Sequence, residues 1–253
     1  MSNARFLYSF KFDEATITSS SDADELPDDN AVDDFVAKVW RTTSDTGQWI
    51  KFDLGSAKKI TMVAIFGHNL TSGATITLEA NSSDSWSPSW DPPGYSKALT
   101  WNEKAIVEFL DETYQWWRIT FEDGSNPDGY IEIGRICAGE YIEPAVNVSQ
   151  DVQKKLIDPS VVQESEGRQG YAIEKDEYRV FDVLFTGIDR TQQDQLISMF
   201  RSVKNIRLLV FALDPDNYPE EDTIYCKLTT PLSQAIGALE YGDVPLSFEE
   251  KVS

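Results

Sequence analysis

A loop over residues 82–95 carries three aromatic side chains that could bind a ligand. Trp86, Trp90 and Tyr95 stand on an otherwise polar, proline-rich stretch with carboxylates nearby. Exposed aromatic rings beside carboxylates can stack on the faces of sugars or anchor a protein interface. Large aromatics are mostly buried, so the alternative is that the tryptophans fold back and plug the end of a β-sandwich. As a binding loop, it fits a neighbouring subunit as well as a glycan.

Residues suited to catalysis are few. His68 is the only histidine, and no serine or cysteine lies in a recognised nucleophile elbow, so we predict a hydrogen-bonded turn histidine. No GxxxxGK[ST] or GxGxxG motif is present, so the sequence gives no support for nucleotide binding. A carboxylate pair for glycoside hydrolysis is recognised by the distance between the two groups in space, which the sequence does not give. With 43 acidic residues in the chain, such a pair stays an open alternative. We predict no catalytic residues and no enzyme, with a glycoside hydrolase as the less favoured alternative.

The composition indicates a globular protein whose charge disfavours nucleic-acid binding. The 253 residues are 41% apolar and 12% aromatic, which is enough for a large core and for two domains. Acidic residues outnumber basic ones by 43 to 22, for a net charge of -21 and with no basic patch, so phosphate backbones would be repelled. No apolar run is long enough to span a bilayer, and we expect a soluble protein. Cys137 and Cys226 lie in apolar segments and are predicted to be buried thiols.

The distribution of tryptophan divides the chain. All seven tryptophans lie between Trp40 and Trp117, and we place the first domain at residues 1–143. Its short apolar segments alternate with turn signals and include no convincing helix, which predicts a sandwich or barrel. The expected strands cover residues 48–55, 60–66, 74–80, 105–109, 116–121 and 130–136.

The second part of the chain has a different pattern. Residues 144–176 are polar and poorly periodic, and we interpret them as a linker, an extended arm or irregular strands. Residues 177–253 predict a smaller β-rich domain with one flanking helix near 191–203, where apolar residues recur at helical spacing and Asp189 or Thr191 can cap. The expected strands of this domain cover residues 179–185, 206–213, 223–229 and 244–249.

One stretch of the first domain resembles a known family. The run Val39-Trp40-Arg41, then residues 47–55 with the pattern WIKFDLG, then the apolar strand at 60–65, resembles discoidin domains, also called coagulation-factor type C or galactose-binding-like domains. The resemblance covers roughly residues 5–142 and implies a jelly-roll β-sandwich. The cysteine pair that brackets extracellular members is missing, which argues against a secreted eukaryotic origin.

The same resemblance bears on an acidic run just before Trp40. Many discoidin-like domains hold a structural calcium at this place, and hard oxygen ligands in a flexible loop suit that ion. The resemblance therefore implies Asp28, Asp29, Asp33 and Asp34 as calcium ligands. Their spacing is not that of an EF-hand, and an acidic run is more often a solvated face, so we expect no cofactor, with this calcium as the alternative.

A second resemblance concerns the whole layout. Residues 130–136 leading to 139–144, followed by a strand-helix-strand domain that ends at 245–250, resemble tail-tip, baseplate or minor tail proteins of bacteriophages, with a tail-tube-like second domain. This implies a structural virion protein, made in the host bacterial cytoplasm, that assembles with other tail proteins and with its own copies in a symmetric ring. Contact with a host surface glycan is a further implied role. The alternative function is a carbohydrate-binding, lectin-like module with Trp86, Trp90 and Tyr95 as its stacking platform.

Overall fold

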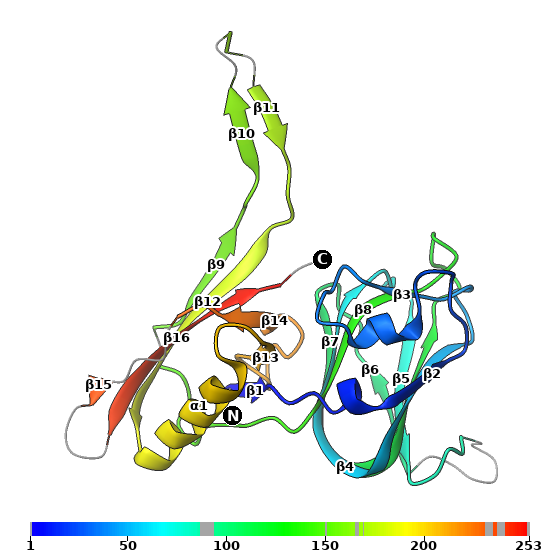
Figure 1. Cartoon of the computed structure of the whole chain (residues 1–253), viewed down its shortest axis with the longest axis horizontal. Helices are drawn as coiled ribbons and strands as arrows, with labels where there is room; N and C mark the ends of the chain where they lie inside the picture. The colour runs from blue at the N-terminus through cyan, green and yellow to red at the C-terminus, as the bar shows by residue number, and fades with distance from the viewer. Residues whose placement is uncertain are drawn as a thin grey trace. The chain divides into compact units, whose positions relative to one another are not determined.

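The computed structural model describes residues 2–86, 94–149, 151–164, 167–168, 170–230, 235–236 and 241–251 (Figure 1). The chain forms two compact units, each built from two segments. Unit 1 comprises residues 1–143 and 209–223, and unit 2 comprises residues 144–208 and 224–253. The described residues are mainly strand with a single α-helix, which confirms the predicted fold class.

Two long, bent strands build the sandwich of unit 1. β4 (Gln48–His68) and β7 (Ala105–Glu122) pair antiparallel along most of their lengths, with a register shift between Asp53 and Lys58. Before the shift β4 also pairs with β2 (Thr16–Ser19), and after it with β8 (Glu132–Gly139). Both strands therefore pass from one layer of the sandwich into the other.

The remaining strands extend these layers. β5 (Thr75–Asn81) lies between β7 and β6 (Tyr95–Leu99), while β3 (Trp40–Arg41) pairs with the outer edge of β8. The 3-10 helices η1 (Phe12–Glu14) and η2 (Asp28–Val32) lie in the connections of the amino-terminal part.

The prediction of separate strands at residues 48–55 and 60–66, and at 105–109 and 116–121, was wrong in one respect. Each pair is a single strand that bends. Gly55, with a φ of 68°, marks the bend in β4 and was interpreted from sequence as a strand end. The ladder continues because β7 bends alongside β4 and pairing resumes at Lys58 and Tyr114.

The core of unit 1 follows from strand alternation. Inward positions carry large side chains such as Phe52 and Trp117, both fully buried, and the ring of Phe12 stacks on Phe52 with centroids 4.0 Å apart. A separate ladder joins distant parts of the chain: β1 (Arg5–Leu7) pairs with β13 (Leu208–Ala212). There the rings of Phe6 and Phe211 stack with centroids 5.1 Å apart, which ties residues 209–223 to unit 1.

Gly139 on β8 allows a close backbone approach. A Cβ at this position would lie 2.2 Å from the carbonyl oxygen of Ser9, which is main chain and cannot swing away. We expect Gly139→Ala to lower the free energy of unfolding by about 1–3 kcal/mol, the usual cost of overpacking. Urea denaturation followed by tryptophan fluorescence measures it. Gly73→Ala is the control, because its new Cβ meets side chains and no main chain: Oγ of Ser125 at 3.3 Å and Oγ1 of Thr71 at 3.6 Å. Equal midpoints for the two variants would contradict the prediction.

Unit 2 is an antiparallel sheet with the helix packed against it. The strand order is β14 (Thr223–Leu228), β16 (Gly242–Glu250), β12 (Tyr178–Ile188) and β9 (Gln153–Ile157), and the short β15 (Ala235–Ile236) also pairs with β16. This sheet buries apolar side chains of β12 and β16, among them Phe181, Phe185 and Phe248.

The helix α1 (Arg190–Val203) lies where the sequence predicts it. Its N-cap is Asp189, whose side chain accepts a hydrogen bond from the backbone N–H of Gln192 at 2.9 Å. Leu196, Met199 and Val203 are buried, in agreement with the helical spacing of the apolar residues. Both cysteines are buried thiols, as predicted.

Residues 153–173 are more regular than an unstructured linker. β9 is followed by β10 (Val161–Glu164), which pairs with β11 (Gly170–Ile173) in a two-stranded hairpin that then leads into β12. Figure 1 shows this narrow hairpin extending beyond the sheet of unit 2. Every residue of β10 and β11 is exposed. Within this part of the chain, β9 belongs to the sheet of unit 2, and β10 and β11 form the hairpin.

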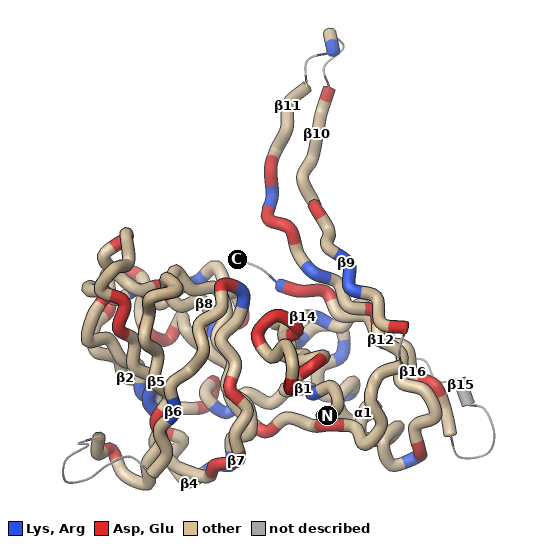
Figure 2. The backbone as a smooth tube through the Cα atoms, turned by 180° about the vertical axis from the view of Figure 1, so that it is seen from behind, with Lys and Arg blue, Asp and Glu red and all other residues tan. Residues whose placement is uncertain are grey.

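The acidic charge is concentrated in one unit. Unit 1 contains 11 basic and 29 acidic residues, a formal charge of -18, whereas unit 2 contains 11 and 14, a charge of -3. Figure 2 shows the acidic positions recurring along the strands and loops of unit 1. Within the residues that the structure describes, no helix is long and apolar enough to cross a membrane.

Candidate functional site

Two tryptophans stand on the solvent side of the layer formed by β2, β4, β7 and β5. Alternation along β4 turns Ile50 and Phe52 into the core and leaves Trp49 partly exposed. On β7 the same alternation buries Trp117 and leaves Trp116 partly exposed. The tryptophan pair 116–117 thus has one inward and one outward member, because adjacent side chains of a strand face opposite sides.

Two cations lie against these rings. Lys51 and Arg118 are directly opposite each other in the β4–β7 ladder. The Nζ atom of Lys51 lies 5.1 Å from the ring centroid of Trp49 and 5.9 Å from that of Trp116. The Cζ atom of Arg118 lies 4.7 Å from the ring centroid of Trp86, which comes from the loop after β5. Cation–π contacts of this kind hold both partners in place.

Each cation also has a carboxylate partner. Asp84 lies 2.9 Å from Nζ of Lys51 and accepts a hydrogen bond from Nε1 of Trp86 at 2.6 Å. Glu79, opposite Arg118 on β5, lies 2.7 Å from its guanidinium. We call this surface the outer tryptophan face; it consists of Trp49, Lys51, Glu79, Asp84, Trp86, Trp116 and Arg118.

The carboxylate of Asp84 is stabilised by its neighbours. Burial alone would raise its pKa, but the hydrogen bonds from Lys51 and Trp86 outweigh burial and hold the pKa below its usual value of 3.8. Because the pKa is lower in the folded state, these contacts stabilise the fold fully above pH 3.8. Their contribution to the free energy of unfolding is lost as the pH falls through the lowered pKa.

The lowered pKa of Asp84 can be observed through its hydrogen-bond partner Trp86. We expect the indole N–H resonance of Trp86 in an NMR pH titration to stay constant from neutral pH to about pH 4 and to shift only below it. The indole N–H of Trp101 is the internal control, because it donates to the backbone carbonyl of Leu70 at 2.9 Å. A midpoint for Trp86 above pH 3.8 would contradict the geometry.

The three aromatic residues predicted to form a binding loop have different places. Trp86 joins the outer tryptophan face, where it is partly exposed. Trp90 lies outside the described residues. Tyr95 starts β6 and packs against the core, with its ring centroid 6.5 Å from that of Trp117. Burial and the charges of Glu108 and Glu112 raise the pKa of Tyr95 to about 12. Trp86 and Tyr95 therefore lie on opposite sides of the sheet, and the role of Trp86 as a contact stays a prediction.

Of the seven residues of the face, the sequence prediction named only Trp86 and missed the other six: Trp49, Lys51, Glu79, Asp84, Trp116 and Arg118. A signal was present, because Trp49 occupies a polar position of the alternating pattern at residues 48–54. A tryptophan at an outward position of a strand is informative, since the core does not need it there. The pairing of β4 with β7, which brings the two strands together, could not be read from the sequence.

The four aspartates proposed as calcium ligands are spread along one loop. Asp28 and Asp29 begin η2, and burial, followed by the nearby charges of Asp22 and Asp29, raises the pKa of Asp28. Asp33 pairs with Nζ of Lys38 at 2.8 Å. Asp34 lies 3.8 Å from the guanidinium of Arg135. Among the described residues, no group of three or more His, Cys, Asp or Glu side chains is arranged to hold a metal. The calcium site stays a prediction from the resemblance.

His68 is the last residue of β4, and its imidazole is mostly buried. Its Nε2 atom lies 3.0 Å from the backbone carbonyl oxygen of Asn102, while Nδ1 has no hydrogen-bond partner in the described part of the chain. Burial lowers the pKa of His68, so the neutral form is favoured. This is the hydrogen-bonded histidine that the sequence predicts.

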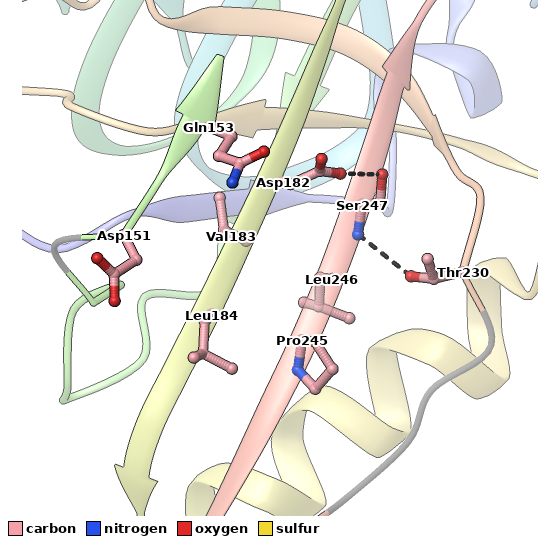
Figure 3. Close-up of a pocket in the computed structure, with 9 residues that line it drawn as sticks. All are labelled: Asp151, Gln153, Asp182, Val183, Leu184, Thr230, Pro245, Leu246 and Ser247. Carbon is pink, nitrogen blue, oxygen red and sulfur yellow. Dashed lines mark hydrogen bonds between the residues drawn. The ribbon is translucent and has the colours of Figure 1, made fainter. Parts of the chain in front are cut away.

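Unit 2 contains an open hollow of about 540 Å³ on the face of its sheet (Figure 3). Three of its polar residues already interact with one another: Ser247 donates from Oγ to Asp182 at 2.5 Å and from its backbone N–H to Oγ1 of Thr230 at 3.2 Å. Asp182 also pairs with Lys155. The lining residues are Asp151, Gln153, Asp182, Val183, Leu184, Thr230, Pro245, Leu246 and Ser247. The contacts of Asp182 and Ser247 hold β12 and β16 together.

Comparison with known proteins gives similarity at the level of solved structures only. No protein-family model matches the chain, and no curated protein matches it. A point mutant of chitosan-binding module 1 from a chitosanase/glucanase of Paenibacillus sp. IK-5 is 17% identical over 52% of this chain and 98% of its own, with a TM-score of 0.41.

Two further solved structures are similar to the same extent. The family 32 carbohydrate-binding module of C. perfringens NanJ, in complex with galactose, is 16% identical over 54% of this chain and 99% of its own, with a TM-score of 0.42. The Streptococcus pneumoniae fucose binding module SpX-3 is 13% identical over 53% and 99%, with a TM-score of 0.43. These neighbours are carbohydrate-binding modules, and none of the three is a tail protein. Scores this low assign neither a family nor a ligand to this chain.

Proposed function

We propose that unit 1 is a non-catalytic carbohydrate-binding module and that the outer tryptophan face is its binding surface. The observation that supports this most directly is the pair of partly exposed rings, Trp49 and Trp116, on adjacent strands around Lys51. The apolar faces of sugar rings stack on aromatic side chains, while carboxylates and amino groups at the edge hydrogen-bond to hydroxyls. Asp84, Glu79 and Arg118 supply these groups.

Stability does not explain these two tryptophans. The core of unit 1 is already filled by inward aromatics such as Trp40, Phe52 and Trp117, all fully buried. An outward tryptophan adds little to that core and leaves apolar surface in water, and clustered apolar side chains on a surface mark interaction sites. Their place among charged side chains fits a polar ligand with apolar faces, which describes a sugar.

A glycan array probed with the labelled full-length protein tests this function. We expect saturable binding to a subset of glycans and loss of that binding in the Trp116→Ala variant. The control variant Phe35→Ala removes an aromatic ring that is 68% exposed and lies off the face, and should bind as the wild type does. Absence of binding across a broad array would refute the proposal.

A second candidate function, favoured by the hairpin of unit 2, is assembly with other protein subunits. Val162 and Tyr171 are 70% and 66% exposed on β10 and β11. An isolated two-stranded hairpin is marginally stable in water, and such an arm gains stability when another chain covers it. This surface would suit the role in a bacteriophage tail tip, in the virion, that the sequence layout implies. The low charge of unit 2 limits repulsion between copies.

Sedimentation velocity of the full-length protein tests assembly through the hairpin. The double variant Val162→Lys, Tyr171→Lys places two charges on the arm, and we expect it to sediment as a monomer at concentrations where the wild type forms oligomers. The double variant Gln195→Lys, Ser202→Lys adds the same two charges at exposed positions of α1, is the matched control, and should leave the oligomer intact. A wild-type monomer at every concentration would refute self-assembly.

A further inference from the structure

We propose that the outer tryptophan face takes a neutral oligosaccharide, in preference to a single sugar or an acidic glycan. This inference rests on the proposed function of unit 1 and specifies its ligand. Three features of the face support it: two separate stacking surfaces, a balance of charges, and the fixed position of residues 82–86 along one side.

The two strand-borne tryptophans offer separate stacking surfaces. Trp49 lies opposite Thr120, and Trp116 lies opposite Asp53, so the two positions are four residues apart along the ladder. At about 3.3 Å per residue this is roughly 13 Å along the strands. Lys51 lies between the two positions along the ladder, and its Nζ atom is 5.1 Å from one ring centroid and 5.9 Å from the other, so the centroids are at most 11.0 Å apart. One sugar can stack on only one ring, whereas a chain of sugars can use both.

The charges of the face cancel. Lys51 is paired with Asp84, and Arg118 is paired with Glu79, with exposed fractions of these side chains between 13% and 38%. A carboxylate or sulfate on a glycan would have to displace one of these partners, leaving a partly buried carboxylate without its cation. The formal charge of -18 on unit 1 adds repulsion. Neutral hydroxyls can share both pairs without breaking either of them.

Residues 82–86, which directly follow β5, are held in place along the face. Asn81, which is 6% exposed, donates from Nδ2 to the carbonyl oxygen of Ser85 at 2.7 Å, and its Oδ1 accepts from the backbone N–H of Ser82 at 2.8 Å. These bonds position Asp84 and Trp86 above Lys51 and Arg118. Because residues 82–86 are already ordered, binding a ligand against them costs less conformational entropy. They also restrict the direction in which a sugar chain can lie.

An array of matched glycans tests the ligand class with the full-length protein. It carries neutral mono-, di- and tetrasaccharides of glucose, galactose, mannose and N-acetylglucosamine, together with uronic acid and sulfated oligosaccharides. We expect neutral tetrasaccharides to exceed the corresponding monosaccharides by at least about tenfold, which is the factor that one further stacking contact of roughly 1.4 kcal/mol gives. Binding should change little between about 50 mM and about 500 mM salt, because screening acts on charge pairs.

The outcomes separate this inference from the function on which it rests. Strongest binding to acidic glycans, weakening with salt, or equal binding of mono- and tetrasaccharides would overturn the ligand class and leave carbohydrate binding intact. No binding to any glycan would overturn both.

A charge-altering variant gives an independent test. Glu79→Gln frees Arg118 from its carboxylate and keeps the size of the side chain. We expect this variant to gain binding to uronic acid oligosaccharides, in a salt-dependent manner, by up to about fivefold, the factor that corresponds to an exposed charge contact of about 1 kcal/mol. Glu122→Gln, a neutralisation at the end of β7 away from the cation pair, is the control and should gain none. Equal behaviour of the two variants would contradict the charge argument.

Discussion

Replacing Arg135 by alanine is expected to lower the free energy of unfolding of unit 1 by about 3–5 kcal/mol. Arg135 lies on β8 with no exposed surface, and its guanidinium is 2.8 Å from a carboxylate oxygen of Asp13. It also donates to the carbonyl oxygen of Val32 and lies 4.9 Å from the ring centroid of Phe10. The arginine thus ties η1 and η2 to the sheet, and its removal leaves Asp13 partly buried without its cation.

Urea denaturation followed by tryptophan fluorescence measures this loss. All seven tryptophans lie between residues 40 and 117, so the signal reports on unit 1. Lys59→Ala is the control: its ion pair with Asp111 is exposed, with side-chain fractions of 44% and 73%, and such pairs contribute at most about 1 kcal/mol. Similar midpoints for the two variants would show that the contacts of Arg135 do not stabilise unit 1 more than an exposed ion pair does.

The second large effect concerns a residue far from the sandwich in sequence. We expect Phe211→Ala to lower the free energy of unfolding of unit 1 by about 3–5 kcal/mol, as for a buried phenylalanine. Phe211 is fully buried on β13 and stacks on Phe6 of β1 with centroids 5.1 Å apart. Because β1 pairs with β13, the variant weakens the only described ladder of β1.

Urea denaturation followed by tryptophan fluorescence tests this expectation as well, because all tryptophans lie in unit 1 and Phe211 belongs to that unit. Tyr218→Ala, in the same segment 209–223 but with a ring that is 58% exposed, is the matched control. A Phe211→Ala transition that coincides with that of the wild type would mean that segment 209–223 does not support unit 1.

The strands and the helix were predictable because their signals are local. Ile50 and Phe52 alternate with polar positions, and Leu196, Met199 and Val203 recur at helical spacing, so burial follows directly from the pattern. The continuity of β4 through Gly55 was not predictable, because it depends on β7 bending alongside it. For the same reason the sequence did not show that residues 209–223 pack with unit 1: the pairing of Phe6 with Phe211 spans most of the chain.

The candidate site was predictable only in part. Trp86 was identified from the composition of its loop, and Tyr95 was included with it because the two are neighbours in sequence. The β6 strand turns Tyr95 toward the core, while Trp86 contacts Arg118 on the other side of the sheet. Trp49 and Trp116 required the register of β4 with β7, in which one residue of slip would exchange the two faces.

The most direct test of the central claim is the affinity of the full-length protein for its strongest array glycan, measured by isothermal titration calorimetry beside the double variant Trp49→Ala, Trp116→Ala. We predict that the double variant binds at least about 100-fold more weakly, from roughly 1.4 kcal/mol for each ring, and that Tyr218→Ala binds as the wild type does. Equal dissociation constants for the double variant and the wild type would contradict the assignment of the outer tryptophan face as the carbohydrate-binding surface.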